Sequence, residues 1–389
     1  MESIHSKKNM QDSKKKLFMW SGFFVVIIII ILLVRYFSLF WGLTIDRDVD
    51  VKQTKEGGTS ILLMGKGGGS HEGPDLTDTI MLASLNPEKN TVDLISIPRD
   101  LYIKSMGSKI NAAYIKGEKE KKGMIYAKAI VASVTGIKPD YAVVIDFSGF
   151  EKLIDLLGGI DVNVDNTLID SAYPTEGKER ELCGVTEDGL ASFSAQIATS
   201  SATESDIFPC RFEVLRIEEG KQHMKGGLAL KFVRSRHALG NEGSDFARSK
   251  RQQSVINAIR EKVLSLGTLA NPLKVVGIIG ILKDNIATDI QENEYDDFIK
   301  LAQKMKGAKI TSHVLDTGDV SDERYGLLIN PPLDESVGFQ WVLSPRAGVG
   351  DYSEIKEYVL CVLEGKECEI TETDVRVIAS PTSVQTKTP

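Results

Sequence analysis

Short β-branched segments alternate with helical segments between residues 59 and 164, and this order constrains the fold more than any other feature of the chain. Predicted strands cover Thr59–Gly65, Thr79–Leu85 and Thr91–Ile97, because β-branched residues are frequent there and Gly, Pro or Asn residues separate the segments. Strands that alternate with helices are typical of layered proteins in which helices cover a sheet. The sequence therefore predicts a layered α/β domain.

The alternation continues to residue 164 and is then interrupted. Further elements are predicted at Ile110–Val134 (helix), Asp140–Asp146 (strand), Phe150–Leu157 (helix) and Ile160–Val164 (strand). Residues 166–221 are polar and rich in Ser, Thr and Glu. Because a connection of this length is usually functional or disordered, we predict a polar insertion there.

Two apolar segments follow the insertion. A helix is predicted over Asp245–Leu266, because Val255, Ile256 and Ile259 recur at helical spacing. Leu273–Leu282 is almost entirely apolar but too short to span a membrane, which favours a buried core helix. A wall of a lipid-binding groove is the alternative for this segment.

An apolar run near the N-terminus predicts a membrane anchor. Five lysines among the first 16 residues precede Leu17–Val34, and roughly 18 apolar residues are enough to cross a bilayer. A cleaved signal peptide is the alternative, but its apolar region is usually about 7–15 residues long and no small-residue cleavage site is obvious here. Lysines before the span predict a cytoplasmic N-terminus and an extracytoplasmic domain in the cell membrane.

These features divide the chain into six predicted parts. They are a cytoplasmic basic tail (1–16), a transmembrane anchor (17–43), a linker (44–58), a main domain (59–317, with the polar insertion 166–221), a C-terminal extension (318–370) and a loose tail (371–389). The composition, 42% hydrophobic and 26% charged residues, is that of ordinary globular protein. No internal repeat is present.

The four cysteines fit an exported domain. Cys183 and Cys210 flank one polar segment, and Cys361 and Cys368 lie seven residues apart. Four cysteines allow two disulfides in three possible pairings, and the sequence leaves the pairing open. The spacing matches no metal-binding pattern, because CxxC pairs are absent.

Basic side chains concentrate in one short region of a chain whose net charge is −7: Arg234, Arg236, Arg248, Lys250 and Arg251. Arg234 and Arg236 alternate as on a strand or an extended loop, so both can point the same way. Arg248 and Gln252 share a helix face if Asp245 caps a helix there. Guanidinium groups bind phosphate oxygens through two parallel hydrogen bonds, so we predict an anion-binding site; a solvated basic face is the alternative.

Carboxylates and a charged pair also follow predicted strands or turns. Asp75 and Asp78 are spaced to offer oxygens from one turn, and Mg²⁺ prefers one or two carboxylates with substrate phosphates; capping of the turn is the alternative. Arg99 and Asp100 end a strand, where α/β folds build sites, although a surface salt bridge would explain them too.

A glycine-rich segment, Gly65–Gly69, follows the first strand and contains Lys66. It lacks the pattern of a phosphate-binding P-loop, because Gly67 follows the lysine where Ser or Thr is required. It also lacks the third glycine of a dinucleotide-binding fingerprint.

Seven motifs occur in a fixed order: Asp78-Thr79, Leu94-Ile-Ser-Ile-Pro-Arg-Asp100, Lys109-Ile-Asn-Ala-Ala-Tyr114, Tyr141-Ala-Val-Val-Ile-Asp-Phe147, Gly158-Gly-Ile-Asp-Val162, Phe232-Val-Arg-Ser-Arg236 and Asp245…Arg248…Arg251-Gln-Gln253. In these motifs the chain resembles the LytR-CpsA-Psr family, also called cell envelope-related transcriptional attenuators. The resemblance covers Thr59 to about Asn166 and Gly226 to about Glu261, and continues more weakly to about Thr317.

The resemblance implies a three-layer α/β/α domain with a twisted central sheet, anchored in the membrane. It implies a phosphotransferase that moves a glycopolymer from a polyprenyl-pyrophosphate carrier to peptidoglycan, with Mg²⁺ or Mn²⁺ as cofactor. The residues that would bind pyrophosphate are Arg99, Arg234, Arg236 and Arg248, and Asp78 would bind the metal. The other residues expected in the substrate-binding pocket are Gln252, Arg251, Asp245, Asp100 and Lys66. No general base is identifiable.

Two positions depart from the family's pattern. Gly67 stands where the family commonly has Asp, and Leu76 stands where it commonly has Arg. Asp75, and Lys66 or His71, are the residues that could substitute. A hydrolase of the lipid pyrophosphate and a non-catalytic scaffold that binds lipid-linked polymer are therefore kept as alternatives. DNA binding is disfavoured, because no DNA-binding helix pair precedes the anchor.

Overall fold

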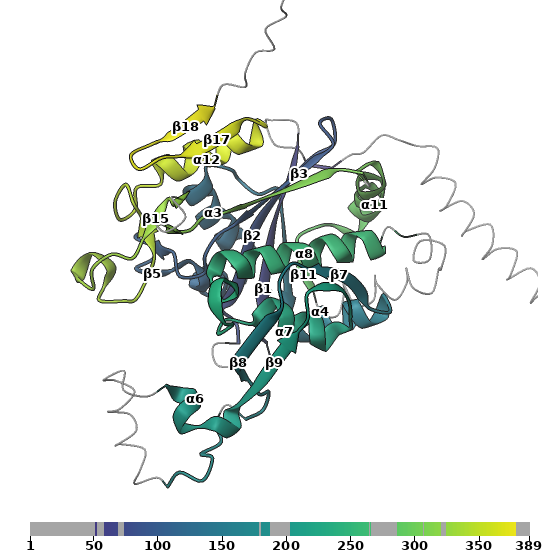
Figure 1. Ribbon diagram of the computed structural model, residues 1–389. Coiled ribbons are helices and arrows are strands. Elements are labelled where there is room, and N and C mark those ends of the chain that lie inside the picture. Colours follow the sequence, from purple (N-terminus) through teal and green to yellow (C-terminus); the bar gives the residue numbers. More distant parts are fainter. Residues whose placement is uncertain are drawn as a thin grey trace, which may run out of the picture. The chain divides into compact units, whose positions relative to one another are not determined.

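The computed structural model describes residues 51–52, 58–68, 74–178, 180–186, 203–263, 265, 286–305, 307–319 and 324–378, without the side chains of 245, 246 and 296. The chain divides into two compact units. Residues 1–51 and 291–303 form one, whose described part is the 3-10 turn η4 (Glu292–Glu294) and most of helix α11 (Tyr295–Lys304). Residues 52–290 and 304–389 form the other, which contains every element discussed below (Figure 1).

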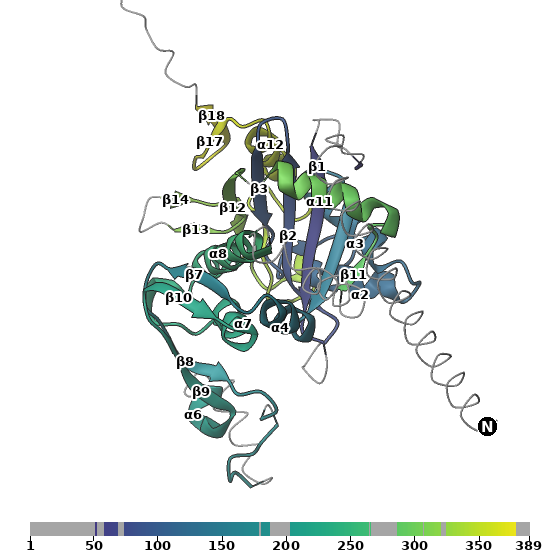
Figure 2. The same cartoon turned by 90° about the vertical axis from the view of Figure 1, so that its right-hand side faces the viewer.

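A six-stranded mixed sheet forms the centre of the larger unit. Its strands, in spatial order, are β11 (Ile286–Thr288), β6 (Tyr141–Asp146), β1 (Thr59–Lys66), β2 (Thr77–Asn86), β3 (Thr91–Ser96) and β12 (Lys309–Val314). β1 pairs in parallel with β6, and β3 with β12, whereas the other three pairs are antiparallel. Figure 2 shows β1, β2 and β3 side by side. The three strands predicted before residue 100 are confirmed.

Helices pack on both faces of this sheet: α3 (Gly123–Thr135) and α12 (Ser353–Leu363) on one, and α8 (Asp245–Val263) on the other (Figure 1). Alternate residues of each strand point to opposite faces. Leu82 and Ile95 therefore pack with α3 and α12, while Met81 and Leu94 pack against Ile256 of α8. Full burial of each such side chain stabilises the fold by about 1.5–3 kcal/mol. The predicted α/β fold with a central sheet is confirmed.

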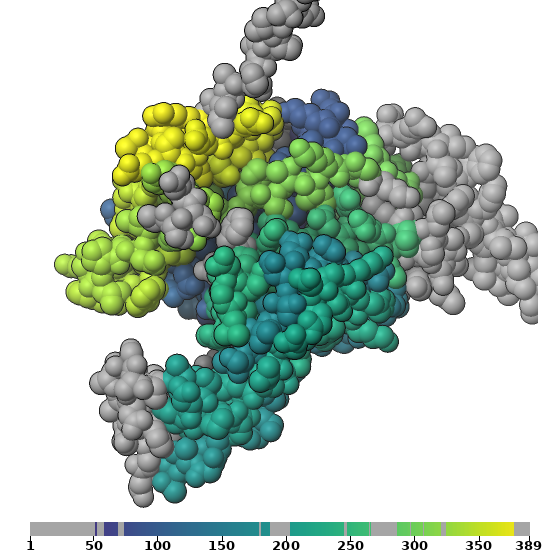
Figure 3. Space-filling model, in the orientation of Figure 1, coloured from purple at the N-terminus to yellow at the C-terminus, as the bar shows by residue number. Residues whose placement is uncertain are grey.

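A second, smaller core lies between α8 and four strands in two pairs. Its elements are α4 (Phe147–Leu156), β7 (Ile160–Val164), β8 (Leu168–Pro174), β9 (Phe212–Ile217), β10 (Gly220–Met224) and α7 (Gly226–Arg234). Phe232 of α7 and Val255 of α8 are 2% and 1% exposed within it. β7 and α8 lie side by side on the face drawn in Figure 3. This core fixes the end of α7 against the start of α8.

The described residues of the insertion 166–221 contain strands and a helix that the sequence analysis did not assign. β8 and β9 pair within it, and the short helix α6 (Glu204–Ile207) and the turn η2 (Pro209–Arg211) lie between them. Within β8, Leu168, Asp170 and Tyr173 are buried, and the pairing register shifts between Asp170 and Tyr173, so the alternation of inward and outward positions is interrupted. The inward aspartate and this shift concealed the strand, because both break the regular apolar alternation.

Both disulfides are defined in the described part of the chain. Cys183 pairs with Cys210, and Cys361 pairs with Cys368. Of the three pairings that the sequence left open, this is the one with a link inside the insertion.

Mass spectrometry of the non-reduced protein should find the peptides of Cys183 and Cys210 joined. By the chain-entropy model, closing a loop of about 28 residues stabilises the insertion by about 3 kcal/mol. The double variant Cys183→Ser/Cys210→Ser should therefore be cleaved faster by protease within 166–221, while the rest of the domain resists as before. Free thiols at both positions in the native protein would contradict the assignment.

The ends of the chain test the predicted boundaries only in part. Within the described residues, no helix is both long and apolar enough to cross a membrane. The predicted anchor 17–43 and the apolar segment 273–282 lie outside those residues. At the other end, β17 (Glu367–Ile370) pairs with β18 (Val375–Ile378), so regular structure extends past residue 371, where a loose tail was predicted.

The remaining elements are short. They are β4 (Tyr102–Ile103), β5 (Ser108–Lys109), η1 (Ile110–Ala112), α2 (Ala113–Glu118), η3 (Gly240–Gly243), β13 (Gly318–Asp319), β14 (Arg324–Tyr325), β15 (Leu328–Ile329), η6 (Glu335–Val337) and β16 (Ser344–Pro345).

Candidate functional site

A cavity of 200 Å³ lies where the start of β2, the loop after β3, the end of α7 and the first turns of α8 meet. Six of the residues predicted from the sequence line it: Asp78, Arg99, Arg234, Arg236, Arg248 and Gln252. Four of these are arginines and only one is acidic. We call this space the arginine cavity.

The pairing of β2 with β3 explains why Asp78 and Arg99 meet. Met81 of β2 lies opposite Ser96 of β3, so the same register continued for three residues places Asp78 opposite Arg99. The ladder itself stops at Pro98, which has no N–H to donate. The Arg99 Nη1 donates to Asp78 Oδ1 at 2.6 Å.

Asp100 holds Arg99 from the other side. Its carboxylate accepts from Arg99 Nε at 3.4 Å and from Lys109 Nζ at 2.6 Å. Burial disfavours the charged form of Asp100, but the hydrogen bond from Lys109 and the charges of Arg99, Lys109 and Arg236 outweigh it and lower the pKa of the carboxyl. Burial likewise works against the charge on Arg99, yet Asp78 and Asp100 raise its pKa. Asp100 is therefore placed to orient the guanidinium of Arg99.

Arg234 and Arg236 reach the cavity from the end of α7. Arg234 is the last residue of the helix, and its guanidinium carbon lies 4.2 Å from the centre of the Phe147 ring. Ser235 then leaves helical geometry, with φ −52° and ψ 131°. The predicted strand or extended loop is therefore wrong for Arg234, which is helical, while Ser235 has extended geometry.

A buried aspartate that the sequence did not single out fixes this loop. Asp170 of β8 is 0% exposed, and its Oδ2 accepts from Ser235 Oγ at 2.7 Å. The same oxygen accepts from the backbone N–H of Arg236 and of His237, each at 3.2 Å. A buried carboxylate needs such partners, since an unpaired one is costly. The only sequence signal was its position two residues after the apolar Leu168.

Arg248 and Gln252 line the cavity from one face of α8, as their spacing predicted. The Gln252 side chain donates from Nε2 to Thr79 Oγ1 at 3.2 Å, which ties α8 to β2. The predicted cap is corrected: Ser244 caps the helix, because its Oγ accepts from Ala247 N at 3.1 Å. Asp245 is instead the first helical residue, and its side chain lies outside the described part of the structure.

Arg251 does not line the arginine cavity, although the sequence placed it in the substrate-binding pocket. Its side chain is 5% exposed, and its three nitrogens donate to Phe232 O (3.1 Å), Glu242 O and Oε2 (2.7 and 2.9 Å) and Ser235 O (2.9 Å). Burial lowers the pKa of Arg251, and Glu242 opposes that effect. The helix turns Arg251 toward α7 and η3, where it joins the segments that carry the cavity.

Lys66 and Asp75 also lie elsewhere than predicted. Lys66 Nζ and Asp75 Oδ1 form an ion pair at 3.0 Å, and neither residue lines the arginine cavity. Among the described residues, no group of three His, Cys, Asp or Glu side chains is arranged to hold a metal. Asp78 is therefore the one carboxylate that the described lining residues offer to the cavity.

An apolar wall completes the cavity. Phe147, Tyr173, Pro174 and Val233 line it beside the arginines. Burial, with smaller contributions from Glu213, Asp170 and Glu176, raises the pKa of Tyr173 to about 12, against the opposing charge of Arg234. Tyr173 therefore stays neutral at physiological pH. Tyr173 and Pro174 come from the insertion, which the sequence had not connected to the site.

Comparison with known proteins agrees with this architecture. The model of the LytR_cpsA_psr family matches residues 43–328. The chain is 26% identical over 252 residues to the polyisoprenyl-teichoic acid–peptidoglycan teichoic acid transferase TagV of Bacillus subtilis, covering 63% of this chain and 53% of TagV. It is 24% identical over 255 residues to a TagU transferase of the same description from Bacillus cereus, covering 64% and 66%.

Among solved structures, the chain is similar to the Lin1025 protein from Listeria innocua, with 25% identity and a TM-score of 0.50. The match covers 80% of this chain and 98% of that one. The chain thus spans about half the length of TagV and just under two thirds of that of TagU.

Proposed function

The chain belongs to the LytR-CpsA-Psr family, and on this premise we propose that it is a phosphotransferase of cell envelope assembly. It would move a glycopolymer from a polyprenyl-pyrophosphate carrier to peptidoglycan. The relatives named as teichoic acid transferases support this proposal.

The arginine cavity is the observation that carries the proposal. Arg99, Arg234, Arg236 and Arg248 converge on 200 Å³, whereas Asp78 is the one acidic group in the described lining. Such an excess of cations favours a multiply charged anion, and guanidinium forks match phosphate oxygens. The adjoining apolar wall fits an isoprenyl chain attached to pyrophosphate.

The chemistry requires little beyond positioning and charge. An acceptor hydroxyl would attack the glycan-bearing phosphorus, forming a phosphodiester, and polyprenyl phosphate would leave. Phosphoryl transfer of this kind is stabilised by cationic groups that neutralise charge on the transferred and leaving oxygens. Asp78 and Asp100 hold Arg99 in place for that role, since each accepts a hydrogen bond from its guanidinium.

We also propose Mg²⁺ or Mn²⁺ as cofactor, held at Asp78. One carboxylate fits such an ion when substrate phosphates and water complete its coordination. When bound, the metal would supply further neutralisation of the pyrophosphate charge. Asp75 fits less well than the sequence suggested, because it does not line the arginine cavity.

Asp78→Asn is expected to abolish metal-dependent transfer, whereas Asp75→Asn should leave the Mg²⁺ concentration for half-maximal rate unchanged. The reason is that Asp78 faces the cavity while Asp75 faces Lys66. Initial rates across a Mg²⁺ series, and Mn²⁺ binding followed by electron paramagnetic resonance, would measure this. A much higher Mg²⁺ concentration for half-maximal rate in Asp75→Asn would instead support Asp75 as a metal ligand, the role that the sequence suggested.

We propose that the domain lies outside the cell membrane, anchored by residues 17–43. The lysines before that run support this orientation. A reporter enzyme that works only after export, fused behind Pro389, should be active in cells. Activity of a cytoplasm-dependent reporter at the same position would reverse the orientation.

One incubation separates the proposal from its alternatives. The purified protein is mixed with a polyprenyl-pyrophosphate glycan and Mg²⁺, with and without peptidoglycan fragments. A transferase releases polyprenyl phosphate mainly when fragments are present, a hydrolase releases it equally without them, and a scaffold binds the donor without turnover. No nucleic acid is expected among the partners.

A further inference from the structure

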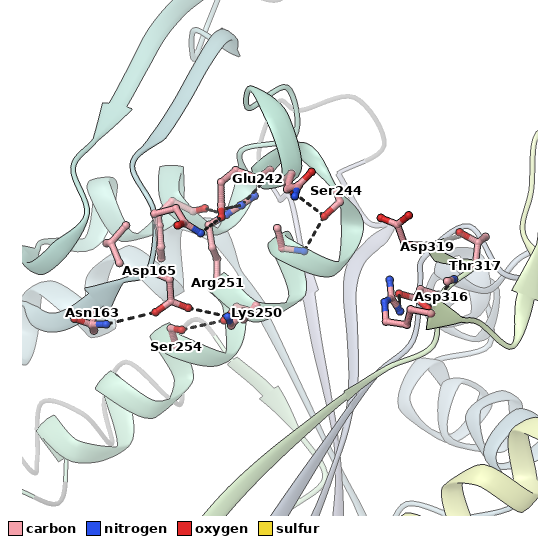
Figure 4. A pocket seen from close by; sticks show the side chains of 17 residues that line it. Asn163, Asp165, Glu242, Ser244, Lys250, Arg251, Ser254, Asp316, Thr317 and Asp319 are labelled. Carbon is pink, nitrogen blue, oxygen red and sulfur yellow. Dashed lines mark hydrogen bonds and ion pairs between the residues drawn. The ribbon is translucent and has the colours of Figure 1, made fainter. Parts of the chain in front are cut away.

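A second cavity, of 390 Å³, lies on the other flank of α8 (Figure 4). Its walls come from the end of β7, the turn η3, the first turns of α8, residues 316–319 and Arg324. Figure 4 shows Asp316 and Asp319 across the space from Lys250 and Arg251. We call it the polar cavity.

The polar cavity differs from the arginine cavity in charge. Four carboxylates face three cationic side chains in its described lining, and three asparagine amides and three hydroxyls lie beside them, together with Val164, Phe232, Ala247 and Gly318. Such a balanced lining gives no net attraction to a polyanion. It offers many hydrogen-bond donors and acceptors to a neutral polar ligand instead.

The lining is pre-organised at its base and accessible at its rim. At the base, Arg251 and Glu242 are 5% and 20% exposed and form an ion pair at 2.9 Å. At the rim, Lys250 and Asp165 pair at 2.9 Å with 60% and 46% of their side chains exposed. A carboxylate has about four acceptor sites, so these rim groups retain capacity for a ligand. A rigid base under accessible polar groups is how specific sites are built.

We propose that the polar cavity binds the acceptor glycan of the transfer reaction, an inference that rests on the proposed function. Each sugar hydroxyl both donates and accepts, so a neutral glycan can bond to carboxylates, ammonium groups and amides together. Its volume lies within the roughly 300–1,000 Å³ of small-molecule sites.

The two cavities lie close enough for one glycan strand to serve both. Phe232 lines the polar cavity, and its neighbour Val233 lines the arginine cavity. The first turns of α8 contribute to both, and a helix is about 10–12 Å across. A strand held in the polar cavity would extend past the start of α8 and present its next hydroxyl to the donor. Arg251, which joins α7 to α8, would keep the two cavities at a fixed distance from each other.

The test titrates the purified full-length protein with two probes: a phosphate-free peptidoglycan tetrasaccharide and a short-chain polyprenyl pyrophosphate. Ser254→Trp places a bulky ring in the polar cavity, and Asp165→Asn/Asp319→Asn removes two acceptor charges without changing volume. Each variant should weaken tetrasaccharide binding at least about tenfold, the size of one lost charge-assisted hydrogen bond. Pyrophosphate affinity should stay within about twofold.

Two controls make the result specific. Glu261→Trp lies exposed on the same helix and lines neither cavity, so it should change neither affinity. Arg236→Ala should weaken pyrophosphate binding and leave the tetrasaccharide unaffected. The inference is overturned if the wild-type protein does not bind the tetrasaccharide, or if Ser254→Trp binds it normally. It is equally overturned if Arg236→Ala alone abolishes binding, since the glycan would then occupy the arginine cavity. Failure of the proposed function is distinguishable, because it would appear as absent pyrophosphate binding in the wild-type protein.

Discussion

Arg236→Ala is expected to lower the rate of glycan transfer by about 10³-fold while the domain stays folded. An arginine that neutralises a transferring phosphoryl group contributes about 10³–10⁵ to the rate. The side chain of Arg236 is exposed and lines the arginine cavity, so its removal creates no cavity in the core. Substitutions of that kind usually change stability by less than about 0.5 kcal/mol. Transfer kinetics and the melting temperature, measured on one preparation, would test the predicted loss of rate and the predicted retention of stability.

Arg236→Lys provides the matched control. Lysine retains the charge but lacks the planar fork, so it should recover only a part of the lost rate. Full activity in the lysine variant would show that charge alone matters at this position. Full activity in the alanine variant would remove Arg236 from the site.

Arg251→Ala should differ from Arg236→Ala in that its main effect is a loss of stability: the domain should unfold far more readily. Removing one partner of a buried ion pair costs about 3–5 kcal/mol, because the other charge is left without compensation. Here Glu242 would lose its cationic partner, and the carbonyls of Phe232 and Ser235 would lose their donors. For a domain of this size the melting temperature should fall by on the order of 10 °C. Thermal and urea unfolding would measure the loss.

Arg248→Ala, three residues earlier on the same helix, is the natural comparison. Arg248 lines the arginine cavity, so its loss should weaken pyrophosphate binding with little change in melting temperature. If instead Arg251→Ala kept its melting temperature and lost pyrophosphate affinity, Arg251 would have the substrate-binding role that the sequence suggested. Its proposed role in holding α7 and η3 against α8 would then be wrong.

Arg248 and Arg251 also show what the sequence could and could not predict. Their residue type and proximity indicated an anion site, and the spacing of Arg248 to Gln252 correctly placed both on one face. The sequence could not tell that Arg251, on the next flank of the same helix, faces three backbone carbonyls and Glu242. That environment is made by α7 and η3, which pack there only in the folded chain.

The strands were easier to predict than the site's supports. Segments such as 59–65 and 91–97 carry short runs of apolar and β-branched residues between turn signals, so local pattern sufficed. Asp170 and Tyr173 were missed, because the polar composition of 166–221 hid a strand whose inward positions include a charge. The Asp75–Lys66 pair was missed for a different reason: spacing shows which carboxylates are near in sequence, but not which cation pairs with them in the folded chain.

The most direct test of the central claim follows oxygen into the product. The wild-type protein is incubated in H₂¹⁸O with a polyprenyl-pyrophosphate glycan and peptidoglycan fragments, and the products are weighed by mass spectrometry. Transfer to a glycan hydroxyl predicts a phosphodiester-linked product without ¹⁸O, together with polyprenyl phosphate. A free glycan phosphate carrying one ¹⁸O, with no linked product, would show that water is the acceptor and would contradict the transferase assignment.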